Sequence, residues 1–128
     1  MRVLLIEDSA LLRASIMDML QACPHVSIDD YAATQQDAVS LLDSKQYDFM
    51  IADIELAQGN GFNVIKHTLQ DTYAFKRPLT LVLTNHTNVY YKNMARTLGV
   101  EYFFDKSMDF EVAIQTIETA SHQFIAPT

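Results

Sequence analysis

Five polar side chains with the chemistry of a cation or phosphate site stand just after short apolar segments of this sequence. Three are the carboxylates of Glu7, Asp8 and Asp53, one is the ammonium of Lys106, and one is the hydroxyl of Thr84. The apolar segments that precede them are residues 2–6, 49–52, 79–83 and 102–104. If each segment is a parallel strand, all these ends lie at one edge of one sheet, where open α/β folds bind ligands. The spacing therefore predicts one shared polar site.

The chemistry of such a site follows from its residue types. Carboxylates crowded into one crevice raise one another's pKa or recruit a cation. A few carboxylate oxygens completed by waters are typical of Mg²⁺. With the Lys106 ammonium nearby, the crevice becomes a receptor for a phosphoryl group, whose charge metal, ammonium and the Thr84 hydroxyl would share. A central carboxylate can then act as nucleophile and form an aspartyl phosphate. Each residue alone could be an ordinary strand-end or capping group, but their coincidence favours a functional site.

Short apolar segments alternate along the chain with segments of helical periodicity, the pattern of repeated strand–helix units. Strands are predicted at about 2–7, 25–31 and 48–53, from Pro78, and at about 101–104. The first helix is capped by Ser9, is broken at Pro24 and has an inner face of Leu12, Ile16, Met19 and Leu20. The second runs from Thr34 to about Asp43, the third has Phe62, Ile65 and Leu69 inside, and the fourth spans about 87–98 and is closed by Gly99. The fifth is capped by Asp109 and has a face of Phe110, Ala113, Ile117 and Ala120.

This order predicts an α/β fold, a doubly wound parallel sheet of five strands with five helices. The strands at 2–7 and 48–53 and the strand from Pro78 lack period-two alternation, as expected when helices cover both faces of a parallel sheet. The segment 25–31 alternates weakly and carries two acids, which suits an edge strand. No repeat or linker interrupts the chain, so we expect one domain over 1–128, without an effector domain, whose output comes from its own surface.

Composition narrows the class of protein. The net charge of −7, with scattered cations, argues against nucleic-acid binding. No segment approaches the ~20 apolar residues of a membrane span, and the first apolar run is too short for a signal peptide. The single Cys23 cannot form an internal disulfide. We therefore expect an acidic, soluble, cytoplasmic domain.

The chain resembles the response regulator receiver domain, the CheY-like family, over essentially its whole length. The motifs that carry the resemblance are Glu7-Asp8 after the first strand, Asp53 in "FMIADIEL", Thr84 in "LVLTN" and Lys106 in "EYFFDKS". The resemblance implies the strand order 2-1-3-4-5. It also implies that Asp53 is the phosphoacceptor in a phosphorylation-driven switch of a two-component or phosphorelay pathway.

The resemblance further implies a ligand set and a switch. Mg²⁺ would be held by Asp8, Asp53 and the backbone carbonyl of Glu55, with Glu7 acting largely through water. Thr84 and Phe103 would form the switch pair: the hydroxyl turns to the phosphoryl group, the ring moves inward, and the face of the fourth helix, fifth strand and fifth helix changes.

Four positions depart from the family's usual pattern. Asn85 follows the switch threonine, where a smaller residue is common, and Ala57 stands where a loop proline is frequent. Ser107 replaces a proline that usually follows a cis bond, and a cis bond before serine would cost roughly 3 kcal/mol, so we expect trans. Phe103 replaces the common tyrosine and lacks its hydroxyl. These changes affect loop geometry and rates and leave the chemistry in place.

Glu55 and His86 stand two residues beyond Asp53 and Thr84. By resemblance they flank the path of the attacking water, and we hypothesise that Glu55 sets the lifetime of the phosphoryl group. The alternative is a solvated loop acid. The four histidines are too scattered for a metal site, and the six methionines are interpreted as core filler. Tyr90 and Tyr91 are either an exposed patch for a partner or, for one of them, part of the core.

The predicted function is that of a switch with self-directed chemistry only: phosphotransfer from a histidine kinase or phosphotransfer protein, then slow self-hydrolysis. Output would be binding of a downstream protein or of a second copy. One alternative is an interaction module of the same fold that works without phosphorylation. Another is a small α/β enzyme: a phosphatase, which this chain's Glu55 and missing cap domain oppose, or a flavin carrier, whose phosphate the strand-end acids would repel.

Overall fold

The computed structural model describes residues 1–125 and contains one parallel sheet of five strands. The strands are β1 (Arg2–Ile6), β2 (Ser27–Ala32), β3 (Phe49–Ala52), β4 (Leu79–Thr84) and β5 (Tyr102–Asp105). Their spatial order is β2-β1-β3-β4-β5, and every neighbouring pair is parallel. The predicted doubly wound α/β fold is thus confirmed, together with the order 2-1-3-4-5 that the family resemblance implied.

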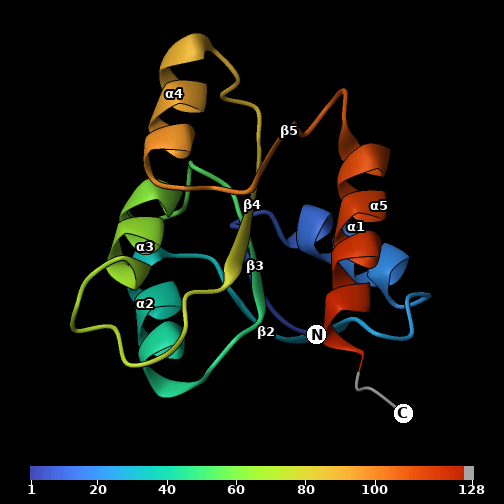
Figure 1. Ribbon diagram of the computed structural model, residues 1–128. Helices are drawn as coiled ribbons and strands as arrows, with labels where there is room; N and C mark the ends of the chain where they lie inside the picture. The colour runs from blue at the N-terminus through green and yellow to red at the C-terminus, as the bar shows by residue number, and fades with distance from the viewer. Residues whose placement is uncertain (126–128) are drawn as a thin grey trace.

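Helices alternate with the strands and cover both faces of the sheet. They are α1 (Ala10–Leu20), α2 (Gln35–Ser44), α3 (Gly61–Thr68), α4 (Val89–Thr97) and α5 (Phe110–Ser121), followed by a 3-10 turn, η1 (His122–Phe124). Helices α2, α3 and α4 lie on one side of the sheet, and α1 and α5 lie on the other (Figure 1). None of the helices in residues 1–125 is both long and apolar enough to cross a bilayer.

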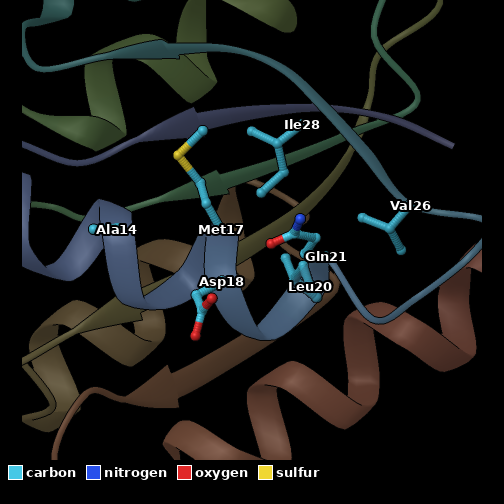
Figure 2. A pocket seen from close by; sticks show the side chains of 7 residues that line it. All are labelled: Ala14, Met17, Asp18, Leu20, Gln21, Val26 and Ile28. Atoms are coloured by element: carbon cyan, nitrogen blue, oxygen red, sulfur yellow. The ribbon is translucent and has the colours of Figure 1, made fainter.

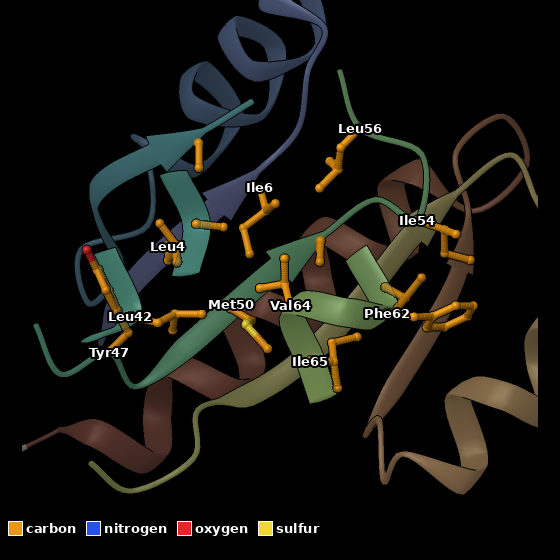
Figure 3. Close-up of a cluster of buried hydrophobic side chains, with 14 of the residues drawn as sticks. Leu4, Ile6, Leu42, Tyr47, Met50, Ile54, Leu56, Phe62, Val64 and Ile65 are labelled. Carbon is orange, nitrogen blue, oxygen red and sulfur yellow. The ribbon is translucent and has the colours of Figure 1, made fainter. Parts of the chain in front are cut away.

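The central strands are buried on both faces, which explains why their sequences are continuously apolar. In β1, Leu4 and Ile6 join the core beneath α2 and α3, whereas Val3 and Leu5 join the core beneath α1 and α5. Figure 3 shows the first of these cores, where Met50 of β3 lies among side chains of the neighbouring helices. Each such fully buried aliphatic side chain stabilises the fold by roughly 1.5–3 kcal/mol.

Side-chain caps fix where the helices begin. The predicted caps Ser9 and Thr34 accept hydrogen bonds from the backbone amides three residues later, at 3.2 and 3.1 Å. Asn88 does the same for α4 at 3.2 Å, so this helix begins at Val89 and not at residue 87 as predicted. The predicted cap at Asp109 is wrong in its chemistry: Asp109 has the N-cap position of α5, but its carboxylate accepts from the backbone of β5 instead.

Two predicted inner-face residues lie outside the core. Met19 is 39 % exposed, because α1 buries its Ile16 and Leu20 instead. Leu69 is 45 % exposed, because α3 ends at Thr68 and Leu69 is already its C-cap residue. The interpretation of the methionines as core filler holds for three of the six, because Met50 is buried and Met1 and Met94 pack against the core. Only Met50 is fully buried, and the residues that are clearly exposed are Met17, Met19 and Met108.

Candidate functional site

The carboxyl ends of β1, β3 and β5 bring an ammonium between two buried carboxylates. Lys106 Nζ lies 2.5 Å from Asp53 Oδ2 and 2.7 Å from Glu7 Oε1. Glu7 is 2 % exposed and Asp53 6 % exposed. A charge-assisted contact of this length in a dry setting is much stronger than a surface ion pair. Lys106 therefore holds the two acids in one crevice, although it stands 53 residues beyond Asp53 in the sequence and still farther from Glu7.

Glu7 is held at both its backbone and its side chain. Its backbone N–H donates to the carbonyl of Ala32 at 2.9 Å, which ties it to the end of β2. Its carbonyl accepts from Arg13 Nη1 at 2.8 Å, and its Oε2 accepts from the Ser9 backbone amide at 2.9 Å. Glu7 is thereby fixed from α1, β2 and, through Lys106, from the turn after β5.

Asp53 is fixed by its own loop. Its Oδ1 accepts from the Ile54 backbone amide at 2.7 Å. The loop folds back so tightly that a Cβ added at Gly61 would lie 2.0 Å from the Asp53 carbonyl oxygen, far inside van der Waals contact. The Gly61 amide meanwhile donates to the Ile54 carbonyl at 2.8 Å. A glycine is therefore required here for close approach of the backbone, and it sets where Asp53 lies.

Asp8 completes a group suited to a hard cation. Ligand oxygens of Glu7, Asp8 and Asp53 all lie within 4.8 Å of one another, and Asp8 is exposed while the other two are buried. Oxygen-only donors with one side open to water are the surroundings in which Mg²⁺ keeps several of its waters. The residues present thus fit a magnesium ion, as the strand-end acids predicted.

Burial and the central ammonium oppose each other in the electrostatics. Burial raises the pKa of Glu7, and the hydrogen bond from Lys106 only partly offsets this. Burial would likewise lower the pKa of Lys106, but its hydrogen bonds to Asp53 and Glu7 prevail and raise it. The ammonium therefore stays charged, and acids remain in excess over bases in the crevice.

Thr84 ends β4 beside this crevice and is completely buried. Its carbonyl accepts from the Lys106 amide at 3.0 Å, so the two predicted residues are held by adjacent strands. Its hydroxyl oxygen accepts from the His86 amide at 3.1 Å, which leaves the hydroxyl hydrogen free to donate. At the surface above, His86 Nε2 contacts Glu55 Oε2 at 2.8 Å, so the two residues predicted to flank the site meet as a pair.

Phe103 is half-buried and packs against the core on the α4 side of the sheet. It also lines a surface hollow of about 250 Å³ between α4, β5 and the turn that follows. Asp105 shapes that turn: its Oδ1 accepts from the amides of Met108 and Ser107, and these bonds lower the pKa of its carboxyl. The Lys106–Ser107 bond is trans, as expected, and residues 1–125 contain no cis peptide bond.

A surface hollow of about 520 Å³ lies elsewhere, between α1 and the edge strand β2 (Figure 2). It is lined by Ala14, Met17, Asp18, Leu20, Gln21, Val26 and Ile28. Asp18 is the one ionisable side chain that lines this hollow, so the hollow gathers no catalytic set.

Other residues considered in the sequence separate into surface and core. Tyr90 is 65 % exposed, whereas Tyr91 is half-buried and stacks on Phe62, so one of the two tyrosines faces the core and a partner role for Tyr90 stays a prediction. His25 and His122 lie edge to face at 6.2 Å, closer than their sequence positions suggested.

Sequence patterns missed the role of Arg13 and of Gly61 in shaping the site. An arginine on a surface helix looks like an ordinary solvated residue. The position of Arg13 in the first turn of the helix after the acid pair could have indicated a contact with that pair. Gly61 is recognisable in the sequence only as part of a turn.

Comparison with known proteins gives a consistent result. A family model described as the response regulator receiver domain matches residues 3–118. A LuxR-family two-component response regulator from Aurantimonas sp. SI85-9A1 has a TM-score of 0.81 at 22% identity, over 95% of this chain and 85% of that one. The response regulator domain of Thermotoga maritima CheB has a TM-score of 0.80 at 20% identity, over 99% and 98%. Vibrio cholerae CheY4 has a TM-score of 0.74 at 24% identity, over 92% and 96%.

A curated relative is similar over a shorter stretch. The protein-glutamate methylesterase/protein-glutamine glutaminase of group 2 operon from Rhodospirillum centenum is 30% identical over 69 residues, which is 54% of this chain. The match spans only 18% of that relative's length. Since the family model covers most of the sequence, the chain belongs to the response regulator receiver domain family of two-component signalling.

Proposed function

From this family membership and the geometry of the site, we propose that the domain is a switch activated by phosphorylation of Asp53. The observation that carries the proposal is Lys106 Nζ at 2.5 Å from Asp53 Oδ2 and 2.7 Å from Glu7 Oε1, with Asp8 in the same cluster. The donor is a phosphohistidine of a histidine kinase or phosphotransfer protein, and the domain works in the cytoplasm. The domain acts on no substrate other than its own phosphoryl group.

In the transfer, a carboxylate oxygen of Asp53 attacks the donor's phosphorus, the P–N bond to the imidazole breaks, and an aspartyl phosphate forms. Mg²⁺, bound by Asp8, Asp53 and the Glu55 carbonyl with Glu7 acting through water, would neutralise charge on the phosphoryl oxygens. Lys106 is already in place beside Asp53 and supplies a second fixed positive charge. The free hydroxyl hydrogen of Thr84 can donate to a phosphoryl oxygen.

The test is phosphorylation by acetyl phosphate with Mg²⁺, followed by intact mass. Wild type should gain one phosphoryl group, and Asp53→Asn should gain none. Asp71→Asn changes an exposed acid in the same way and serves as the matched control. Wild type that stays unmodified, or Asp53→Asn that is modified equally, would refute the assignment.

We further propose that Glu55, paired with His86, sets the lifetime of the aspartyl phosphate. The side chains of Glu55 and His86 are 74% and 38% exposed, so water reaches the pair, and the family resemblance implies that these positions flank the path of the attacking water. Glu55→Asn should change the dephosphorylation rate measured after removal of the donor. Asp43→Asn breaks the comparable surface pair with His67, 2.6 Å long, and should leave the rate unchanged. Equal rates for Glu55→Asn and wild type would discard this role.

The output is proposed to pass from Thr84 and Phe103 to the face of α4, β5 and α5. Phosphorylation adds up to about two negative charges, and movement of Thr84 toward them would leave room for Phe103 to turn inward. The hollow that Phe103 lines would then change shape, and Tyr90 offers an exposed ring on the same helix α4. The partner is a downstream protein or a second copy of the domain.

Beryllofluoride with Mg²⁺ tests this output without a kinase. Amide shifts along α4, β5 and α5 should change in wild type and be much smaller in Thr84→Val. The elution volume before and after addition reports whether two copies associate. Shifts confined to the metal site would contradict this route of signalling.

A further inference from the structure

Arg13 connects the turn that carries Asp8 to the rest of the domain. Its Nη1 donates to the Glu7 carbonyl at 2.8 Å, and its backbone amide donates to the Ser9 carbonyl at 2.9 Å. Both ends of the residue therefore hold the three-residue turn from Glu7 to Ser9, and Asp8 is the middle of that turn. Asp8 itself is exposed. Its direction must be set largely by the backbone on either side of it.

Tyr31 holds Arg13 in turn. The guanidinium carbon lies 4.3 Å from the centre of the Tyr31 ring, a stacked cation–π contact. Tyr31 stands on the edge strand β2, in register with Leu5 of β1, and 53% of it is exposed. A residue on a rigid strand thus restrains a long side chain that would otherwise be free to leave the Glu7 carbonyl.

We propose that Arg13, restrained by Tyr31, is a positioning residue that orients Asp8 toward Asp53 and so strengthens binding of Mg²⁺. The inference rests on the proposed function, because it assigns Asp8 to the metal. Outer contacts that orient metal ligands typically change metal affinity by 10–100-fold when they are removed. Arg13 acts through the backbone and not on a ligand atom, so the lower end of that range is expected.

The charge of Arg13 and its proposed positioning role have opposite effects on Mg²⁺ binding. An experiment can therefore separate the two. Arg13 is a cation close to an acidic cluster, so its charge repels Mg²⁺. If charge were its whole contribution, its removal would tighten Mg²⁺ binding. If Arg13 positions Asp8, its removal weakens binding in spite of the lost repulsion.

The experiment is a titration with Mg²⁺ alone, followed by amide shifts of the strand-end loops in ¹H–¹⁵N spectra. Arg13→Met keeps the apolar stem but has no donor, and it should weaken Mg²⁺ binding roughly tenfold. Tyr31→Leu should weaken it by a smaller factor. Tyr31→Phe keeps the stacked ring and should bind like wild type. A thermal melt without Mg²⁺ separates loss of stability, which a merely structural role would produce, from loss of metal affinity.

Unchanged or tighter binding in a folded Arg13→Met would overturn the inference and leave the proposed function intact. If Arg13→Met does not fold, Tyr31→Leu decides in the same way against Tyr31→Phe. Wild type that shows no Mg²⁺-dependent shifts at the strand ends would overturn both proposals. Phosphorylation of wild type by acetyl phosphate is measured in parallel, so that the two failures are told apart.

Discussion

Removal of the Lys106 ammonium should destabilise the domain more than any exposed lysine can. Lys106→Met leaves the carboxylates of Glu7 and Asp53, 2% and 6% exposed, without their shared counter-ion. Breaking a buried pair by removing one partner costs about 3–5 kcal/mol, because the remaining charge stays desolvated. We therefore expect a loss of that size in the free energy of unfolding, measured by urea denaturation at pH 8 with EDTA present.

Lys45→Met is the matched control. Lys45 contacts Asp30 at 3.0 Å, but its side chain is 44% exposed, so water screens the pair and the expected loss is at most about 1 kcal/mol. Binding of Mg²⁺ should raise the free energy of unfolding of Lys106→Met by about 2.7 kcal/mol when the free Mg²⁺ concentration is a hundredfold its Kd.

The loss should also depend on pH, with a definite sign. Burial raises the pKa of Glu7 in the folded state, so its protonated form is favoured on folding. Such a group contributes stability below its unfolded pKa, which is near 4.5, and this contribution disappears as pH rises through the folded value. Without Lys106 the folded pKa rises further, so the gap between variant and wild type should widen from about pH 4.5 upward. A gap that is independent of pH, or no larger than that of Lys45→Met, would refute the reasoning.

Three further predictions concern the loop, the edge strand and the metal. Gly61→Ala places a Cβ 2.0 Å from the Asp53 carbonyl oxygen, so we expect a loss of about 1–3 kcal/mol in urea denaturation and slower phosphorylation; an unchanged rate would contradict the role of this contact. Tyr47→Phe removes the hydroxyl that donates to Asp30 at 2.5 Å and is the main cause of the lowered pKa of that acid. The substitution should cost about 1–2 kcal/mol at neutral pH. The difference should shrink as pH falls below about 4, toward the lowered folded pKa of Asp30, because this stability exists only while Asp30 is ionised; equal acid denaturation curves for Tyr47→Phe and wild type would exclude this role of the hydroxyl. Chelation of Mg²⁺ by EDTA should abolish phosphorylation by acetyl phosphate, and intact mass checks this.

The sheet and its functional edge could be predicted because burial on both faces leaves a strong sequence pattern. Uninterrupted apolar segments as short as those before Glu7 and Asp53 are typical of strands covered by helices on both sides, and parallel strands must end at the same edge. The strand order was not present in that pattern. It came from the family resemblance, since periodicity describes each strand alone and not its neighbours.

Predictions failed where one position depends on contacts outside its own helix. Met19 and Leu69 have the spacing of inner-face residues in an amphipathic helix. The packing of α1 and the end of α3 nevertheless leave them at the surface. Asp109 has the type and position of a cap, yet the backbone of β5 offers its carboxylate a competing donor. The role of Arg13 was not predicted at all. Its contacts with Glu7 and Tyr31 join three separate elements, and no local sequence pattern shows such contacts.

Charge explains why the proposed phosphoryl transfer would need both Lys106 and a divalent cation. Three carboxylates and one ammonium give the crevice a formal charge of two negative units. A phosphoryl donor is itself negative, so the crevice alone repels it, and Lys106 is already engaged by two acids. Asp8 and Asp53 would hold a divalent cation that brings the crevice to neutrality, and Lys106 would then be free to follow the incoming group. In the proposed transfer, the negative charge of Asp53 would be replaced by the larger charge of the phosphoryl group, about two units at neutral pH. The charge balance would then shift by about one unit beside Lys106 and Thr84, and this shift would be the differential interaction that biases two arrangements of the α4, β5 and α5 face.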